Sequence, residues 1–220
     1  MCERAACCIT SAIDMQLYLA SKSPRRREIL QQLGIDFLLL PTQPPALPGL
    51  AEVDETPLAN EPAHTYVERV TLAKAEYGWQ ALLRALPAAD LEAAWVLAAD
   101  TTVVCQDEIL GKPADPQEAA QILRKLAAGT HHVLTGMALQ NHRRRLYRVS
   151  SSAVQFRALS EAEIALYIAS GEALDKAGAY GIQGRAAKFV RHLEGSYTGV
   201  MGLAAYELEQ MLKAVDDEAA

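Results

Sequence analysis

The segment SKSPRRREIL, residues 21–30, places three consecutive arginines directly after an apolar run and a Ser-x-Ser-Pro turn. If a helix begins at this turn, its dipole disfavours positive charge there, so the arginines need another explanation. Backbone N–H groups at a helix start, together with guanidinium groups, form an anion site. Arg25 and Arg26 are therefore candidate phosphate ligands. The alternative is a charge run that only faces solvent.

A carboxylate and two lysines are further candidates for chemistry. Asp100 lies in the apolar, β-branched stretch WVLAADTTVVC, where burying a charge is costly unless it is paired or binds a metal. A structural hydrogen bond to a neighbouring loop is the alternative role. Lys112, in the turn GKP, is a candidate phosphate ligand or a solvated turn lysine. Lys74 shares a helix face with Val67 and Val70, and extension of its amine to solvent is the alternative.

Two loops complete the set of candidate site residues. Asp54 and Glu55, in the proline-rich acidic segment 42–61, could hold a divalent cation together with Asp100, because hard cations prefer oxygen ligands. An acidic loop that only aids solubility is the alternative. Gln183 lies in the glycine-rich segment 176–184 and could read the edge of a base, or belong to a tight surface turn. Cations for phosphates, acids for a metal and an amide for a base all suit a nucleotide.

The elements that must position these residues follow from periodicity and turn signals. We expect strands at 17–20, 37–41, 95–105, 131–139, 145–159 and 187–195, and helices from 24 to 33, 62 to 86, 116 to 128, 161 to 170 and 206 to 215. Ser23 is expected to cap the first helix, and Ser160 with Glu163 to form a capping box. Strands and helices intermix without strict alternation, so we predict a mixed α/β sheet without a linker between domains.

Composition excludes several functional classes. The net charge of −6 argues against a general nucleic-acid binder, and no apolar run is long enough to cross a bilayer. Three of the four cysteines crowd the N-terminus without a CxxC pair, which argues against a zinc site. The first fifteen residues lack the pattern of a signal peptide. We therefore expect a cytoplasmic protein without membrane or nucleic-acid partners.

Six linked motifs resemble those of the Maf family of nucleoside triphosphate pyrophosphatases. In order along the chain they are LASKSPRRREILQQLGIDF, VDETP, YVERVTLAKA, VLAADTTVV, GKPADPQEAAQILRKLAAGTHHVLTGMAL and FRALSEAEIALYIASGEALDKAGAYGIQG. The resemblance spans about residues 17–203. Residues 1–14 have no counterpart, so they are expected to be a disordered or mis-assigned extension before one catalytic domain at 15–215. The chain departs from the family pattern at Ala99, at Ala204 and in the longer loop 42–53.

The resemblance implies a strongly twisted sheet flanked by helices, two lobes around a central nucleotide cleft as in inosine-triphosphatase-like proteins, and a homodimer. It implies hydrolysis of a nucleoside triphosphate to the monophosphate and pyrophosphate, with Mg²⁺ or Mn²⁺ as cofactor. Asp100 corresponds to the family's proton acceptor. The phosphate-contacting positions correspond to Ser21, Arg25, Arg26, Lys74 and Lys112, the metal-binding positions to Asp100, Asp54 and Glu55, and the positions linked to substrate choice to Arg25, Thr101 and Gln183.

The motif DKAGAYGIQG, with Arg25 after Pro24, is similar to the branch of the family that acts on dTTP and UTP. The expected function is therefore removal of dTTP, UTP or modified pyrimidine nucleotides from the nucleotide pool. A pyrophosphatase for 7-methyl-GTP is one alternative. The other is a nucleotide-binding regulator of cell division with little turnover, because family members have been associated with division arrest.

Overall fold

The computed structural model describes residues 15–40 and 52–217. Within them one mixed sheet of seven strands has the order β2-β1-β3-β5-β6-β7, with β4 paired to β3. The strands are β1 Gln16–Leu19, β2 Leu38–Leu39, β3 Ala94–Cys105, β4 Glu108–Leu110, β5 Thr130–Gln140, β6 Arg145–Phe156 and β7 Val190–Glu194. The helices are α1 Pro24–Gln32, α2 Ala63–Ala85, α3 Ala88–Leu91, α4 Pro116–Leu126, α5 Glu161–Ala169, α6 Tyr197–Met201 and α7 Ala205–Asp217, with 3₁₀ turns η1 Ala177–Ala179 and η2 Arg185–Phe189. The predicted fold class is confirmed.

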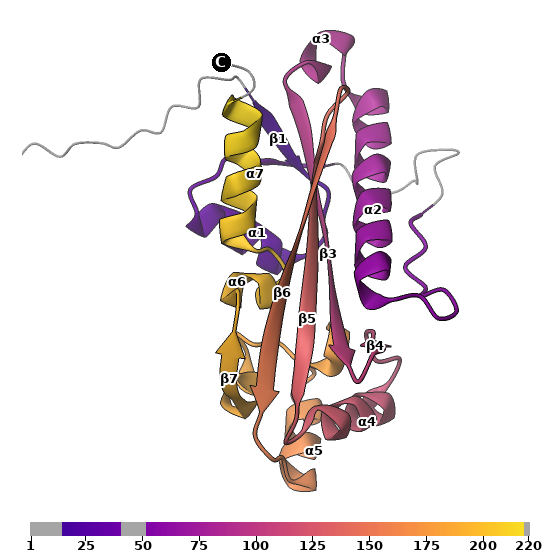
Figure 1. Cartoon of the computed structure of the whole chain (residues 1–220), viewed down its shortest axis with the longest axis vertical. Helices are drawn as coiled ribbons and strands as arrows, with labels where there is room; N and C mark the ends of the chain where they lie inside the picture. Colours follow the sequence, from indigo (N-terminus) through magenta and orange to yellow (C-terminus); the bar gives the residue numbers. More distant parts are fainter. Residues whose placement is uncertain (1–14, 41–51, 218–220) are drawn as a thin grey trace, which may run out of the picture.

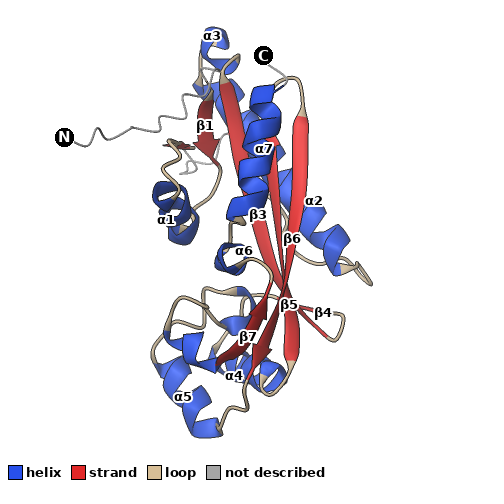
Figure 2. Cartoon of the chain, turned by 60° about the vertical axis from the view of Figure 1, so that its left-hand side comes forward, coloured by secondary structure: helices blue, strands red, loops and turns tan. Residues whose placement is uncertain are grey.

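Three long antiparallel strands, β3, β5 and β6, run through the whole length of the molecule and twist about one another (Figure 1). Helices α1, α2 and α7 surround one end of these strands, and α4, α5 and the 3₁₀ turns surround the other (Figures 1 and 2). Each end has its own apolar core, one around Leu97 and Leu139 and one around Phe156 and Phe189. The two lobes therefore share a continuous sheet.

Alternation along β3 gives its two faces different neighbours. Val96 and Ala98 face α2, whereas Leu97 and Ala99 join the core beneath α1 and α7. By the same alternation Asp100 faces α2 and Thr101 faces the α1 side, which places neighbouring residues on opposite faces of one strand. Figures 1 and 2 show α2 and α7 on opposite sides of the long strands.

Helix α2 packs closely against the sheet because small residues line the contact. Thr71, Ala75 and Gly78 are buried on the face that meets the strands. A Cβ at Gly78 would lie 2.8 Å from a methyl group of Val96, and a Cβ at Gly136 on β5 would lie 2.5 Å from the Thr71 hydroxyl. Side chains at these two glycines would push the helix outward. The close approach brings the middle of α2 to the centre of β3.

One edge of β3 is interrupted at its centre. Strand β5 pairs with the other edge from Val96 to Val104. On the interrupted edge β1 pairs only as far as Leu97, and β4 begins to pair only at Val103. Between these points, at residues 98–102, no described strand pairs with this edge. We call this interruption the β3 gap, and Asp100 lies at its centre.

Most of the predicted elements are confirmed, including the Ser160–Glu163 capping box at the start of α5. Three expectations were wrong in detail. Of the strand predicted at 37–41, the described residues 37–40 contain only the two residues of β2, and the predicted glycine loop contains η1. The short helices α3 and α6 were not predicted. Ser23 is at the N-cap of α1 but its side chain makes no capping bond; its backbone N–H donates to the Ser21 hydroxyl. Residues 1–14 and most of the segment 42–53 lie outside the described residues.

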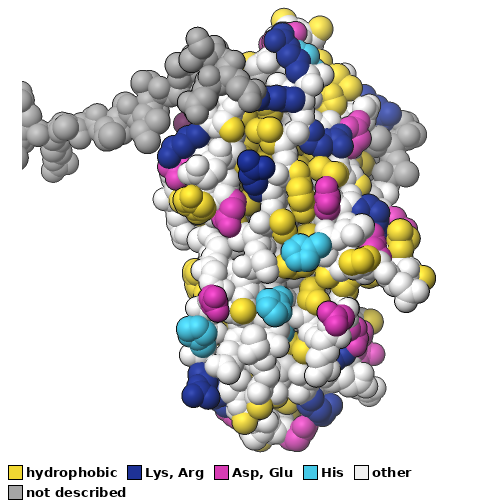
Figure 3. Space-filling model, viewed as in Figure 1, with side chains coloured by type: hydrophobic (Ala, Val, Ile, Leu, Met, Phe, Trp, Pro, Cys, Tyr) yellow, Lys and Arg dark blue, Asp and Glu magenta, His cyan; other side chains and the backbone are white. Residues whose placement is uncertain are grey.

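Charged side chains of both signs are interspersed over the face shown in Figure 3. Several form ion pairs between elements, such as Arg145 with Glu76 and Arg124 with Glu161. Exposed pairs of this kind contribute little to stability, so the two apolar cores hold the lobes together. Among the described helices, none combines the length and apolar character that crossing a membrane would require.

The buried His131 should make stability depend on pH. Burial, with a smaller effect of His132, lowers its pKa to about 4, and its Nε2 lies 2.8 Å from the Tyr180 hydroxyl. An unfolded histidine takes up a proton near pH 6.5, which the folded one does not. Unfolding free energy should therefore fall as pH drops from 6.5 towards 4, by an amount of order 3 kcal/mol.

Urea unfolding at a series of pH values measures this dependence. His131→Gln should flatten the profile between pH 6.5 and 4, whereas His132→Gln, at the exposed neighbouring position, should keep it. Identical profiles for the wild type and His131→Gln would contradict this assignment.

Candidate active site

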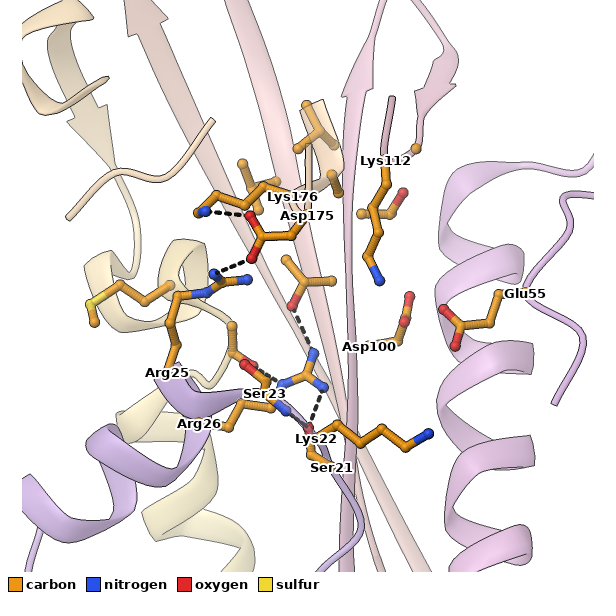
Figure 4. A pocket seen from close by; sticks show the side chains of 18 of the residues that line it. Ser21, Lys22, Ser23, Arg25, Arg26, Glu55, Asp100, Lys112, Asp175 and Lys176 are labelled. Atoms are coloured by element: carbon orange, nitrogen blue, oxygen red, sulfur yellow. Dashed lines mark hydrogen bonds and ion pairs between the residues drawn. The ribbon is translucent and has the colours of Figure 1, made fainter. Parts of the chain in front are cut away.

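A cleft of about 710 Å³ opens at the β3 gap. This volume suits a ligand of nucleotide size. Its walls come from both lobes and include almost every site residue predicted from sequence. Figure 4 shows several of them, among them Arg25, Asp100 and Lys112. The predicted residues that line it are Ser21, Arg25, Arg26, Glu55, Lys74, Asp100, Thr101, Lys112 and Gln183.

Asp100 is the most buried acid in the cleft, with 6% of its surface exposed. The Lys74 ammonium donates to Asp100 Oδ1 at 2.7 Å and lies 2.9 Å from Glu55 Oε1. Lys74 is thus held between two carboxylates, and it balances the charge that Asp100 brings into the sheet. This arrangement explains how a buried charge is tolerated in an apolar strand.

The acidic loop that carries Glu55 is fixed to α2 by two side chains. The Tyr66 hydroxyl donates to the Glu55 carbonyl oxygen at 2.9 Å. Burial and the negative charges of Asp100 and Glu55 raise the Tyr66 pKa to about 12, so the hydroxyl remains a donor at neutral pH. Arg69 forms a two-pronged pair with Glu61, at 2.7 and 2.8 Å, and also donates to the carbonyl of Thr56 at 3.0 Å.

Asp54 and Glu55 are adjacent in sequence but differ in position. Glu55 lines the cleft, whereas Asp54 does not. Asp54 Oδ1 instead accepts the backbone N–H of Thr56 at 2.9 Å, and this hydrogen bond lowers the Asp54 pKa. The structure therefore brings Asp100 and Glu55 together but leaves Asp54 in a local turn.

Residues 21–26 form the wall of the cleft beside β1. The Ser21 hydroxyl accepts from the Ser23 backbone N–H and from Arg26 Nη1, at 3.2 and 3.1 Å. The α1 N-terminus has no acidic residue in its first turn and no side-chain cap. Its dipole and the guanidinium groups therefore present positive potential to the cleft. Burial lowers the pKa of Arg26, and the charge of Asp100 opposes this shift.

Arg25 reaches across the cleft to the other lobe. Its guanidinium lies 3.7 Å from an Asp175 carboxylate oxygen, and Lys176 donates to the other oxygen of the same carboxylate (Figure 4). Burial alone would raise the Asp175 pKa, but the hydrogen bond from Lys176 and the charges of Lys176 and Arg25 outweigh it, so the pKa is lowered. Asp175 thus takes the position beside the Arg25 guanidinium that an anionic ligand would otherwise take.

The opposite wall is formed by the β4–α4 connection and by the glycine-rich segment. The Lys112 side chain extends towards Asp100 (Figure 4). Gly178, at φ +69°, packs its backbone against Val103 and donates its N–H to the Gly111 carbonyl at 3.0 Å. This contact holds the segment that carries Gln183 against the rim of the cleft.

The donors suit a divalent cation only if a ligand supplies part of its coordination shell. No cluster of three or more His, Cys, Asp or Glu side chains among residues 15–40 and 52–217 could hold a metal by itself. Asp100 and Glu55 supply two carboxylates that meet at Lys74. Mg²⁺ is commonly bound by one or two carboxylates together with substrate phosphates. The two acids therefore fit a cation that arrives with a polyphosphate.

Sequence reasoning missed the residues that position the site from a distance. Tyr66 and Arg69 hold the acidic loop, Asp175 meets Arg25, and Thr135 lies 3.0 Å from Thr101 through their hydroxyl oxygens. The acidic residues of the loop and the arginine on α2 could have suggested the Arg69 contacts. The other three depend on long-range contacts that leave no local pattern.

Together, the mixed sheet, the gap lined by cations and the buried carboxylate form a cleft whose charges suit a polyanion beside an acid. A model of the Maf-like protein family matches residues 16–215. The dTTP/UTP pyrophosphatase of Aromatoleum aromaticum is 49% identical over 203 residues, covering 92% of this chain and 96% of the relative. That of Dechloromonas aromatica is 51% identical over 199 residues, covering 90% and 96%. The chain belongs to the Maf-like protein family.

The Arg69 anchor predicts a measurable change in loop order. Arg69→Met removes four donated hydrogen bonds to the segment 54–61. Bonds to charged groups are worth about 1.5–3 kcal/mol each, so backbone amides of the loop should exchange at least about tenfold faster. Amide hydrogen exchange at Thr56 and Leu58 measures this, with Arg148→Met as a control on the exposed part of β6. Equal exchange rates in Arg69→Met and wild type would show that the loop is held by other contacts.

Proposed function

We propose that the protein hydrolyses nucleoside triphosphates, with dTTP and UTP preferred, to the monophosphate and pyrophosphate. The observation that carries the proposal is Asp100, buried at the β3 gap and paired with Lys74, with the cations of α1 and Lys112 around it. A triphosphate laid along residues 21–26 would meet the guanidinium groups and the start of α1. Its α-phosphorus would then lie beside Asp100, a buried carboxylate of the cleft.

In this mechanism Asp100 is the proton acceptor. Lys74, which can only donate, fixes Oδ1 through its hydrogen bond. Asp100 orients a water molecule and takes its proton as the water oxygen bonds to the α-phosphorus. The bond from this phosphorus to the bridging oxygen breaks, and pyrophosphate leaves with the electron pair.

The cationic side chains stabilise the charge that develops on the phosphates. Arg25 and Arg26 come from α1 and Lys112 from the β4–α4 connection, so they can contact phosphates from different sides. Positioned charges in a cleft shielded from water are usually the largest contribution to such catalysis. Asp175 must give up Arg25 when a triphosphate enters, which makes binding an exchange of one anionic partner for another.

Asp100 and Glu55 would hold the divalent cation that the family implies. A bound Mg²⁺ or Mn²⁺ would polarise the phosphate oxygens and neutralise part of their charge. Lys74 lies between the two carboxylates, so it keeps them at a fixed separation in the absence of other cations. Asp54 does not line the cleft, so the proposal gives it no part in holding the cation.

The substrate preference rests on the relatives and on three cleft residues. The relatives in Aromatoleum aromaticum and Dechloromonas aromatica are dTTP/UTP pyrophosphatases, and identity near 50% extends over nine tenths of the chain. Arg25, Thr101 and Gln183 all line the cleft, as residues linked to substrate choice must. Modified pyrimidine nucleotides present the same edges and are included in the proposal.

A homodimer and a cytoplasmic location are further parts of the proposal. Both rest on resemblance to the family and on the sequence. Light scattering of the purified protein tests the first, and cell fractionation tests the second.

The substitution Asp100→Asn should abolish turnover without abolishing binding. Loss of a general base typically slows a reaction by about 10²–10⁴-fold, while the phosphate-binding cations remain. Pyrophosphate release from dTTP and UTP, with CTP, GTP and 7-methyl-GTP alongside, measures both turnover and selectivity. Asp107→Asn is the matched control, because Asp107 lies at the exposed β3–β4 turn at φ 63°, a conformation that asparagine also adopts.

Each result decides between the candidate functions. Selective turnover of dTTP and UTP that Asp100→Asn loses supports the proposal. A preference for 7-methyl-GTP would overturn the assigned substrate and keep the chemistry. Tight binding without turnover in the wild type would favour a nucleotide-binding regulator.

The two neighbouring acids should respond differently to loss of charge. Glu55→Gln removes one of the two carboxylates at Lys74, so the Mg²⁺ concentration for half-maximal activity should rise about tenfold, a typical cost of weakening a metal site. Asp54→Asn keeps an oxygen that can accept from Thr56 and should leave this concentration unchanged. Titration of activity with Mg²⁺ compares them. An equal rise in both variants would contradict the separation of Asp54 from the site.

A further inference from the structure

Arg26 belongs to a chain of hydrogen bonds that leaves the cleft and enters the sheet. Its Nη2 donates to Thr101 Oγ1 at 3.3 Å, and Thr101 Oγ1 lies 3.0 Å from Thr135 Oγ1. Thr135 is directly opposite Thr101 on β5 and is 1% exposed. Its hydroxyl donates to the carbonyl oxygen of Gly199, in α6, at 2.8 Å.

The chain closes on itself through α6. The backbone N–H of Gly202 donates to the same Gly199 carbonyl at 2.9 Å. The carbonyl of Gly202 in turn accepts from Arg26 Nε at 2.8 Å. A ring of hydrogen bonds therefore joins α1, β3, β5 and α6. Gly202 is at φ +122°, a backbone conformation that glycine tolerates best.

The direction of every bond in this ring follows from simple hydrogen counting. A carbonyl oxygen only accepts, so the single hydroxyl hydrogen of Thr135 is used on Gly199. The hydrogen between the two threonines must therefore come from Thr101. An arginine only donates, so Thr101 accepts from Arg26. The Thr101 hydroxyl consequently offers the cleft an acceptor and no hydrogen.

We propose that Thr135 is a positioning residue for the cleft: its hydroxyl fixes the direction of the Thr101 hydroxyl and, through it, the plane of the Arg26 guanidinium. This proposal rests on the phosphate-binding role of Arg26 in the function proposed above. The ring and Ser21 together use three of the five N–H groups of Arg26. Two remain for a ligand, and their directions are set because the guanidinium is planar.

The role of Thr135 also concerns what Thr101 can recognise. Any ligand group that meets the Thr101 hydroxyl must bring a hydrogen, because the hydroxyl hydrogen is held by Thr135. Without the Thr135 hydroxyl, Thr101 would be free to rotate and donate. Thr135 lies outside the residues that line the cleft, so it acts through Thr101 and not by touching the ligand.

Three substitutions separate the hydroxyl from the volume of the side chain. Thr135→Val keeps the shape and removes the hydroxyl, and Thr135→Ser keeps the hydroxyl. Thr71→Val is the matched control, because Thr71 is equally buried on α2 and its hydroxyl has no hydrogen-bond partner among the described residues. Steady-state kinetics with dTTP and thermal unfolding are measured for all three and for the wild type.

Thr135→Val should raise the KM for dTTP about tenfold and change kcat less than about threefold, the effect of one lost hydrogen bond in a charged network. Thr135→Ser and Thr71→Val should both stay within about twofold of the wild type. A wild-type KM in Thr135→Val would overturn the proposal. So would equal impairment of Thr135→Val and Thr135→Ser, because that result would assign the effect to volume.

A second measurement does not depend on turnover. In ¹⁵N NMR the Arg26 Nε–H, assigned by its loss in Arg26→Lys, should exchange slowly with water in the wild type and Thr135→Ser. In Thr135→Val it should exchange at least about tenfold faster. Unchanged exchange would overturn the proposal. Failure of the wild type to hydrolyse any nucleotide would instead count against the proposed function, and the NMR result would still decide the role of Thr135.

Discussion

The site depends on the interruption in the pairing of β3. A central strand with both edges paired would present only its faces to helices, and no ligand could approach its backbone. Here β1 stops at Leu97 and β4 starts at Val103, so one edge is open for five residues. Because side chains alternate along a strand, Asp100 and Thr101 border the gap from opposite faces. Side chains on the α2 face and on the α1 face of the sheet therefore line the same cleft.

Each face of β3 holds a charged group of a different sign, and each charge is stabilised in a different way. On the α2 face a buried carboxylate is balanced by Lys74, which reaches it because glycines let the helix lie close to the sheet. On the opposite face the half-buried guanidinium of Arg26 donates to hydroxyl and carbonyl oxygens. In the proposed function the Asp100 carboxylate accepts a proton and the Arg26 guanidinium binds phosphate. The strand between them keeps the two charges from forming a direct pair that would exclude a ligand.

Much of this arrangement could be predicted from sequence, and the limits have physical reasons. A charge in an apolar β-branched run identifies Asp100, and a lysine on an apolar helix face identifies Lys74. The sequence could not distinguish the roles of Asp54 and Glu55, because both are acidic and adjacent. They differ only in the structure, where Asp54 accepts a backbone N–H. It also could not find Thr135, whose role depends on register with Thr101 and on a carbonyl 64 residues away. The short helix α6 was missed because a five-residue element has too few positions to show a period.

The most direct test of this account is a crystal structure with a dTTP analogue whose bond between the α- and β-phosphates is an imido linkage. The triphosphate should lie in the β3 gap along residues 21–26. Its α-phosphorus should be close enough to Asp100 for one water molecule to bridge them, and Arg25 should have left Asp175 for a phosphate. A triphosphate bound away from the gap, or one whose base occupies the gap while its phosphates face solvent, would contradict it.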